Sequence, residues 1–522
     1  MGYSSTQLYP SQRSPVAARN IVATSQPLAV QAGLDAIKQG GNAVDAALAS
    51  AITLTIVEPS GNGIGSDAFA LIWDGSTLHG LNASGRAPAA WTPEYFDGHS
   101  RMPQFGWDSV TVPGAVSAWV ALSAKFGTLP FEQLFTRAID YAERGYAVGP
   151  VTASLWQTVE QECSSQPGFA DHFLPAPAAG DIFHRPDAAA SLDKIAQTRG
   201  DAFYRGELAD RLEQAAIAGN GALRKSDLEA HQCDWVTPIT QHYRDVTVHE
   251  IPPNGQGLAV LIALGILDYF DAPPCDSADS VHLQIEAMKV ALRAAADHIA
   301  DPDTMQTTVD ALLDATSLAR VAAGIGQKAS ALPPAALPSS QDTVYLSTAD
   351  ADGMMVSFIQ SNFYRFGSGV VVPQTGIALQ NRGWGFSLEA GHPNQVGPGK
   401  RPFHTIIPAF ATRDGKPFAS LGVMGGPMQA QGHAQMIVRL VDHQQNPQCA
   451  SDAPRWQVLD DFSVLLEPGF NSDVADELAS RGHRLRFADS SAAFGGAQLI
   501  VRQDDGYVAG SDHRKEGCAA GF

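Results

Sequence analysis

Residues 341–353 read Gln-Asp-Thr-Val-Tyr-Leu-Ser-Thr-Ala-Asp-Ala-Asp-Gly, and they decide how the chain is organised. Thr343 opens a strand-like run that directly follows the Pro/Ser-rich segment 332–341. If the peptide bond between Asp342 and Thr343 is cut, the threonine carries a free α-amine beside its own hydroxyl. An α-amine has an ordinary pKa of about 8 and can accept the hydroxyl proton, which activates the nucleophile. Threonine also favours strands in general, so the stretch alone leaves both interpretations open.

The character of the sequence changes at Thr343. Before it, helical patterns broken by proline and glycine turns dominate residues 110–300; after it, short apolar strands alternate with glycine turns. The spacing of apolar residues predicts helices at 27–39, after Asn42, and at 115–126, 131–144 and 281–299. It predicts strands at 68–73, 343–348, 354–360, 369–372, 377–379 and 406–410. A helix-rich part followed by a strand-rich part predicts layered sheets covered by helices.

Composition narrows the classes of partner. The chain has 522 residues, with 34 basic and 54 acidic side chains and a formal charge of −20. Nucleic acids and anionic membranes need a basic surface, so neither is expected as a partner. No apolar run approaches the ~20 residues of a membrane span, and the N-terminal segment lacks the apolar core of a secretory signal. An odd, scattered set of cysteines fits reduced thiols in the cytoplasm; they are Cys163, Cys233, Cys275, Cys449 and Cys518.

Motifs for cofactors and for other nucleophiles are weak or missing. Gly61-Asn-Gly-Ile-Gly65 superficially resembles a dinucleotide fingerprint, but it precedes a strand instead of opening a helix. Ser191-Leu-Asp-Lys194 fits the S-x-x-K pattern, but the accompanying motifs of serine acyl-enzymes are absent. The sequence has no H-E-x-x-H, no paired Cys/His set and no Walker A loop. We therefore expect neither a metal nor an organic cofactor.

Two adjacent glycines, Gly425 and Gly426, follow an apolar strand. They predict either a tight turn or an oxyanion hole, where backbone N–H groups without a neighbouring Cβ approach a developing negative charge.

Two further loops carry cations. Residues 399–405 place Lys400 and Arg401 beside His404 and Thr405, which indicates either a solvated loop or an anion-binding wall. In residues 380–385, an arginine and a tryptophan lie among glycines. This arginine, Arg382, is a candidate for a bidentate carboxylate contact; the alternative is a surface arginine stacked on Trp384.

A series of short motifs in chain order resembles the γ-glutamyltransferase family of N-terminal-nucleophile hydrolases. The motifs are Gly40–Ala47, Gly61–Gly65, Val112–Val116, Lys125–Pro130, Asp301–Asp303, Thr343–Gly353, Phe366–Gly369, Gly399–Pro402, Gly425–Gly426 and Gly510–Arg514. Each is weak alone, but their joint order spans nearly the whole chain.

The resemblance implies an α+β fold, a four-layer αββα sandwich made as one self-cleaving precursor. Cleavage between Asp342 and Thr343 would give a helix-rich large subunit, 1–342, with a Pro/Ser-rich tail from about 326, and a strand-rich small subunit, 343–522. The two fragments would form a heterodimer, which could pair into a dimer of heterodimers.

The resemblance also implies roles for individual residues. Thr343 would be the nucleophile and new N-terminus, and Gly425 and Gly426 the oxyanion hole. Ser361 falls where the family has a hydroxyl that bonds the nucleophile's α-amine; serine in place of threonine keeps that hydroxyl.

The sequence departs from the family where a γ-glutamyl group would bind. Ser84 stands in place of the arginine that holds the α-carboxylate, with Arg86 nearby, and Gly385 in place of the acid that holds the α-amine. The remaining departures are Arg382 for a glutamine, Phe363 for an asparagine, and His404-Thr405 for a Ser-Ser pair.

These departures favour a small, anion-selective pocket. A bound ammonium without its carboxylate partner loses several kcal/mol of recognition. An amide with a carboxylate but no amine, such as oxamate, which would give oxalate and ammonia, is the favoured small-molecule substrate. The alternatives are a glutathione hydrolase or γ-glutamyltransferase, an acylase for another acyl amide such as a β-lactam side chain, and a degenerate relative that only binds.

Overall fold

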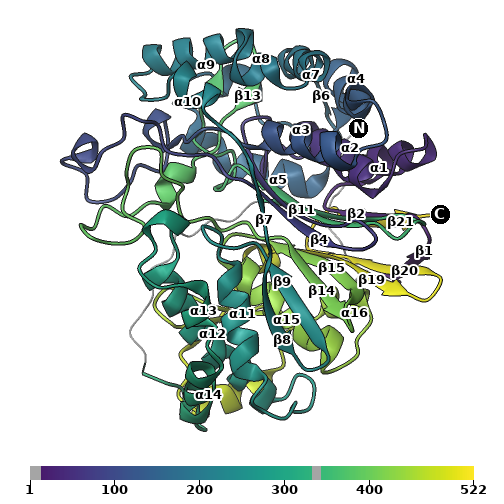
Figure 1. The fold of residues 1–522 in the computed structure, drawn as a ribbon, viewed down its shortest axis with the longest axis vertical. Coiled ribbons are helices and arrows are strands. Elements are labelled where there is room, and N and C mark those ends of the chain that lie inside the picture. Colours follow the sequence, from purple (N-terminus) through teal and green to yellow (C-terminus); the bar gives the residue numbers. More distant parts are fainter. Residues whose placement is uncertain (1–12, 332–342) are drawn as a thin grey trace.

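The computed structural model describes residues 13–331 and 343–522, and within them two seven-stranded sheets lie between two layers of helices (Figure 1). This is the four-layer α+β sandwich that the resemblance implied. Asp342 and most of the Pro/Ser-rich segment lie outside the described residues.

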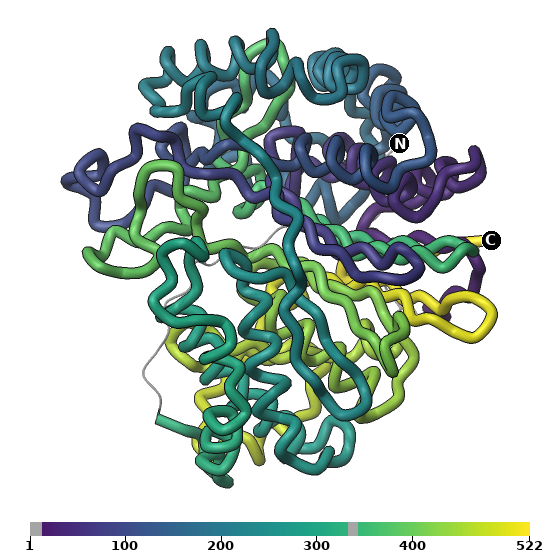
Figure 2. The backbone as a smooth tube through the Cα atoms, viewed as in Figure 1, coloured from purple at the N-terminus to yellow at the C-terminus, as the bar shows by residue number. Residues whose placement is uncertain are grey.

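The first sheet contains the strand that begins beside Thr343. Its order is β21 (Cys518–Gly521), β2 (Ile21–Thr24), β10 (Val344–Ala349), β11 (Met355–Ser361), β3 (Asp67–Trp73), β4 (Leu78–Ala83) and β7 (Asp234–Val236). β10 pairs antiparallel with β2 on one side and β11 on the other. Figure 2 shows the purple N-terminal strands alongside the green strands that follow Thr343. The parts of the chain before and after Thr343 therefore share one sheet.

The second sheet also draws on both parts of the chain. Its order is β1 (Val16–Ala18), β20 (Gly506–Ser511), β19 (Gly496–Gln503), β15 (Lys416–Met424), β14 (Ala409–Arg413), β9 (Val246–Glu250) and β8 (Ile239–Tyr243). Apolar side chains from both sheets fill the space between them, among them Phe69, Leu71, Tyr345, Ile359, Phe410 and Met424. Because β10 packs on β15, the end of β15 lies over the centre of the first sheet.

One helix layer covers the outer face of the first sheet. Its main helices are α1 (Pro27–Lys38), α2 (Ala43–Val57), α3 (Ala115–Phe126), α4 (Thr136–Arg144), α5 (Pro150–Cys163), α7 (Pro186–Thr198), α8 (Asp201–Tyr204), α9 (Glu207–Ala218) and α10 (Lys225–Glu229). Every residue of α2 is buried, which its alanine-rich faces allow. The Asn42 side chain accepts bonds from Val44 N and Asp45 N, and the Asp45 carboxylate accepts one from Asn42 N. This capping box fixes the helix start where the sequence predicts it.

A second helix layer covers the outer face of the other sheet. It comprises α11 (Gly257–Leu267), α12 (Ala278–His298), α13 (Val309–Leu312), α14 (Ala315–Gly324), α15 (Met428–Val441), α16 (Pro447–Asp452) and α17 (Ser472–Ser480). None of the helices in the described ranges combines the length and apolar character needed to cross a membrane.

Most predicted elements are confirmed, with local differences. The helix expected at 131–144 is divided into the 3₁₀ helix η3 (Phe131–Phe135) and α4, and the strand expected at 369–372 is only β12 (Val371–Val372). The stretch 110–300, read as mostly helical, also contains the strands β5 (Tyr146–Ala147), β6 (Ile182–Phe183), β7, β8 and β9. The strand expected at 406–410 begins only at Ala409; the preceding residues 402–405 run beside the 254–256 loop, and Ile407 N donates to the side chain of Gln429.

Candidate active site

Thr343 lies immediately before β10, in the middle of the first sheet, and is 1% exposed. Its hydroxyl oxygen is 3.1 Å from the hydroxyl oxygen of Ser361, the last residue of the neighbouring β11. The loop at Gly61 lies next to this pair, since Asn362 N donates to Gly61 O at 3.2 Å. The strand pairing thus brings the two predicted hydroxyls together.

Gly425 and Gly426 form the turn between β15 and α15. Both have positive φ, 122° and 58°, and a Cβ on Gly425 would lie 2.9 Å from the Gly495 Cα. Only glycine satisfies this conformation and this close contact. The turn opens the N-terminus of α15, where unpaired N–H groups and the helix dipole favour a negative charge. The geometry is compatible with an oxyanion hole.

Arg382 opens the short 3₁₀ helix η5 (Arg382–Gly385) and is completely buried. Its Nη1 donates to Thr405 Oγ1 at 2.9 Å, and its guanidinium lies 4.5 Å from the centre of the Phe363 ring. Its Nε and Nη2 have no hydrogen-bond partner among the described residues. Burial lowers the pKa of Arg382 to about 9, so it remains a cation at neutral pH. A buried cation with unsatisfied N–H groups is costly unless an anion joins it.

A buried carboxylate–imidazole pair lies near this arginine. His404 Nε2 donates to Asp67 Oδ2 at 3.1 Å. His404 Nδ1 accepts from Ile406 N at 3.4 Å, so the proton of the neutral imidazole is on Nε2. Burial raises the pKa of Asp67 to about 7, against the pull of Arg382 and of backbone N–H groups. Burial and Arg382 hold the pKa of His404 well below its ordinary value, so the imidazole is neutral. Near neutral pH the charge beside Arg382 therefore depends on Asp67.

Gln256 connects residues 404–405, which lie beside Arg382, to the Gly425–Gly426 turn. Its side-chain Nε2 donates to Thr405 O at 2.5 Å and to Gly426 O at 3.0 Å, and its backbone N–H donates to His404 O at 2.9 Å. On the other side, Phe363 N donates to Ser361 Oγ at 2.8 Å. Hydrogen bonds and ring contacts thus run from the nucleophile to Arg382 and on to the glycine turn.

Two residues named from the family pattern take other positions. The Ser84 hydroxyl is buried; it donates to Asn82 Oδ1 at 2.8 Å and accepts from Asn254 Nδ2 at 3.2 Å. Arg86 has a side chain that is 42% exposed and lies 3.4 Å from Asp301 Oδ2. Contacts link the remaining described candidates from Thr343 through Arg382 to the glycine turn, while Arg86 donates to Gly399 O in an outer loop.

Asp67 and Gln256 were not predicted from the sequence. Asp67 begins an otherwise apolar strand, and its position beside the site comes from its pairing with Ser361 across β3 and β11. The only signal for Gln256 was a polar Asn-Gly-Gln run between Pro253 and an apolar helix.

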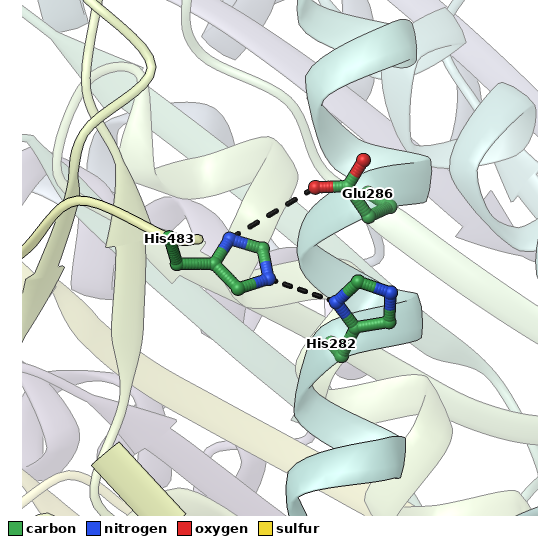
Figure 3. Close-up of side chains that lie close together, drawn as sticks. All are labelled: His282, Glu286 and His483. Carbon is green, nitrogen blue, oxygen red and sulfur yellow. Dashed lines mark hydrogen bonds and ion pairs between the residues drawn. The ribbon is translucent and has the colours of Figure 1, made fainter. Parts of the chain in front are cut away.

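A separate cluster of His282, Glu286 and His483 lies in the second helix layer (Figure 3). His282 Nδ1 is 2.8 Å from His483 Nε2, and His282 Nε2 donates to Gly326 O at 2.8 Å. The Glu286 carboxylate accepts from Lys289 Nζ at 2.7 Å and from the backbone of residue 330 at 2.9 Å. Because an ammonium group already balances the carboxylate, the cluster serves to hold residues 326–330 against α12.

Comparison with known proteins adds independent findings. The family profile described as Gamma-glutamyltranspeptidase matches residues 29–522. The oxamate amidohydrolase proenzyme of Klebsiella pneumoniae is 36% identical over 527 residues, 98% of this chain and 99% of the relative. The glutathione hydrolase-like YwrD proenzyme of Bacillus subtilis is 34% identical over 528 residues, 98% of this chain and 100% of the relative.

A solved structure is also similar over the whole chain. The crystal structure of cephalosporin acylase from Bacillus halodurans superposes with a TM-score of 0.95 and 45% sequence identity. The match covers 100% of this chain and 99% of that one. Relatives with three different substrate names are thus similar to this chain over nearly its full length.

Proposed function

The chain belongs to the gamma-glutamyltranspeptidase family, and on that premise we propose that it is a self-cleaving threonine amidohydrolase for small amides that carry a carboxylate, such as oxamate. The observation behind this substrate class is Arg382, a completely buried cation with N–H groups that lack a partner among the described residues. A substrate carboxylate would accept from these N–H groups and balance the charge.

The first step is cleavage of the precursor between Asp342 and Thr343. The Thr343 hydroxyl attacks the Asp342 carbonyl carbon, the C–N bond breaks as an ester forms, and water hydrolyses the ester. This frees the Thr343 α-amine and leaves fragments 1–342 and 343–522. Because both sheets contain strands from both fragments, the fragments would stay together as a heterodimer.

Turnover repeats this chemistry on the substrate. The Thr343 hydroxyl attacks the amide carbon, and its proton passes through the α-amine to the leaving nitrogen. The N–H groups of Gly425 and Gly426 stabilise the tetrahedral oxyanion, with one such donor worth roughly 3–4 kcal/mol. Water then hydrolyses the acyl ester, which releases oxalate and restores the hydroxyl.

The same pocket is unfavourable for a γ-glutamyl group. A Cβ at Gly385 would lie 2.8 Å from Phe403 O, so an acidic side chain cannot be placed there without moving the backbone. An α-amine near Arg382 would then find only Asp67, among the described residues, as a carboxylate, and burial raises the pKa of Asp67 to about 7, so the amine would be costly to bind. Glutathione hydrolysis therefore remains the less favoured alternative.

The cysteines bear on the cellular compartment. All five are free thiols, and Cys275 and Cys449 are exposed. Exposed thiols persist in a reducing environment, so we place the protein in the cytoplasm. Recovery of the native protein from the periplasmic or secreted fraction would contradict this location.

Two assays test the proposal. Purified protein should run as two fragments on a denaturing gel, and the Thr343→Ala variant as one, without activity. Ammonia release from oxamate should exceed turnover of γ-glutamyl-p-nitroanilide. An intact chain that still cleaves oxamate would overturn the mechanism. Turnover of γ-glutamyl-p-nitroanilide faster than that of oxamate would overturn the proposed substrate class. A chain that neither splits nor cleaves either amide would indicate a binding protein.

A further inference from the structure

A cavity of about 700 Å³ lies beside the proposed acyl site. The two share structural walls: Trp384 and Gly385 follow Arg382 in η5, and Phe403 directly precedes His404. Other lining residues are 99–102, the end of α12 and Ile299. The segments that position the proposed anion site therefore also line the cavity.

Phe363 contacts both the residues of the proposed acyl site and a residue that lines the cavity. Its backbone N–H donates to Ser361 Oγ, and the centre of its ring lies 4.5 Å from the Arg382 guanidinium and 5.4 Å from the centre of the Trp384 ring. Phe363 has a φ of 79°, a conformation that bulky residues rarely adopt and that is concentrated at functional sites. The buried Phe363 and the partly exposed Trp384 thus form an aromatic contact that leads from Arg382 to the cavity lining.

We propose that this cavity binds the leaving group, and that the substrates include secondary amides whose amine is a flat aromatic ring. This inference rests on the proposed function and specifies its substrate class. Ammonia, the leaving group of oxamate, needs no cavity of this size. Pockets that bind drug-sized molecules usually have volumes of about 300–1,000 Å³. With the substrate carboxylate on Arg382 and the amide carbon at Thr343, the nitrogen substituent would extend past Phe363 into the cavity.

The lining favours an uncharged aromatic amine. Trp384, Phe386 and Phe403 offer aromatic surface, and such rings pair with a flat ring in offset or edge-to-face geometry. The lining contains one arginine and one carboxylate, Arg101 and Glu389, whose opposite charges offset each other, together with the imidazoles of His99 and His392. In the reaction, the bond between the acyl carbon and the amine nitrogen breaks as the Thr343 ester forms. The hydroxyl proton goes to the departing amine, and water then releases the acid.

The test compares oxamate with its N-phenyl derivative, oxanilate, which shares the acyl group and differs in the leaving amine. Ammonia and aniline release are measured for the wild type, Trp384→Ala and a matched control, Trp235→Ala. Trp235 is 39% exposed and packs against Phe126 and Lys125, away from the cavity. We expect Trp384→Ala to lower kcat/KM for oxanilate about ten-fold more than for oxamate. Trp235→Ala should leave the ratio unchanged.

A second variant fills the cavity in place of removing its wall. Leu388→Trp adds volume at a half-buried lining position and should also reduce oxanilate turnover more than oxamate turnover. Both variants are first checked on a denaturing gel for the two fragments of the cleaved chain. If the Trp384→Ala precursor does not cleave itself, the comparison of the two substrates is made with Leu388→Trp.

Each outcome has a distinct consequence. Oxamate cleavage without oxanilate cleavage, or equal losses on both substrates in the variants, would overturn the leaving-group site and leave the proposed function standing. Failure of the wild type to cleave either amide would overturn both.

Discussion

Two arginines, Arg455 and Arg382, are completely buried in this molecule, and their surroundings differ. Arg455 lies 2.6 Å from Asp512 Oδ2 and donates to Phe494 O at 2.7 Å and Ser451 O at 3.0 Å. Arg382 has one hydroxyl partner, an aromatic ring, and a nearby acid whose pKa is raised to about 7.

The difference in hydrogen-bond and charge partners distinguishes an arginine that stabilises the fold from one that can still bind an anion. Burial lowers the pKa of Arg455 to about 10, and Arg455 and Arg514 in turn hold the pKa of Asp512 far below its ordinary value. That charge pair is complete within the protein. Beside Arg382 the only compensating carboxylate, among the described residues, is one that burial pushes toward its neutral form. Equal burial therefore leaves one charge satisfied and the other available to an anion.

The largest expected effect is on stability, at Arg455. Arg455→Ala leaves Asp512 buried with Arg514 as its remaining cation, and removing one member of a buried ion pair costs about 3–5 kcal/mol. Urea unfolding, followed by circular dichroism, should show a decrease of this size in the free energy of unfolding. A decrease below about 1 kcal/mol would mean that the pair contributes no more than a surface salt bridge.

The next effect is on activity, at Arg382. Arg382→Ala should lower kcat/KM for oxamate by about 30- to 1,000-fold, because charge-assisted hydrogen bonds to the substrate carboxylate are lost. Its free energy of unfolding should decrease less than that of Arg455→Ala, since few native bonds are broken. Steady-state ammonia release and urea unfolding measure the two quantities.

Arg382→Lys is the matched control, because it keeps the charge and loses the planar pair of donors. Its activity should lie between those of the wild type and Arg382→Ala. A variant at Arg382 that unfolds like Arg455→Ala yet retains oxamate turnover would remove the distinction between the two arginines.

A smaller effect concerns pH, through Asp67. Since the pKa of Asp67 is raised to about 7, this acid loses its charge as the pH falls through 7 and no longer competes with the substrate for Arg382. The KM for oxamate should therefore fall about three- to ten-fold between pH 8 and pH 6. Over the same range kcat should fall, because protonation of the Thr343 α-amine, with an ordinary pKa of about 8, removes the general base.

Asp67→Asn separates these two titrations. The neutral amide should give a low KM that no longer changes between pH 6 and pH 8, while the decline of kcat persists. A KM that rises as the pH falls in the wild type would contradict the assignment of Arg382 as the carboxylate-binding group.

Local sequence signals predicted the parts of the site that depend on local structure. In the structure, Asn42 caps a helix start, Thr343 directly precedes a strand, and the glycine pair 425–426 follows an apolar strand, as the sequence predicts. The sequence also identified Arg382, but it left open whether this residue is a surface arginine. Its burial depends on how η5 packs against Phe363 and Thr405, which are distant contacts.

The missed features depend on register between distant strands. Asp67 reaches the site because β3 pairs with β11, which places Asp67 opposite Ser361 across almost 300 residues of chain. Gln256 reaches it because residues 254–256 run beside 402–405. β8 and β9 were missed because they contain polar residues that also suit surface helices, and β8 is buried only at its last residue, Tyr243.

The smallest effect is expected at a third arginine, Arg86, which lies near the position where the family places its carboxylate-binding arginine. Its side chain is 42% exposed, and its contact to Asp301 is 3.4 Å long, so Arg86→Ala should change the free energy of unfolding by less than about 1 kcal/mol. Oxamate kcat/KM should change by no more than about three-fold, because the polar partners of this side chain among the described residues are Asp301 and Gly399 O, at 3.1 Å, and neither belongs to the proposed acyl site. If Arg86→Ala instead abolished turnover while Arg382→Ala retained it, the substrate carboxylate would bind at the position used by the family. The buried arginine would then serve the fold, as Arg455 does.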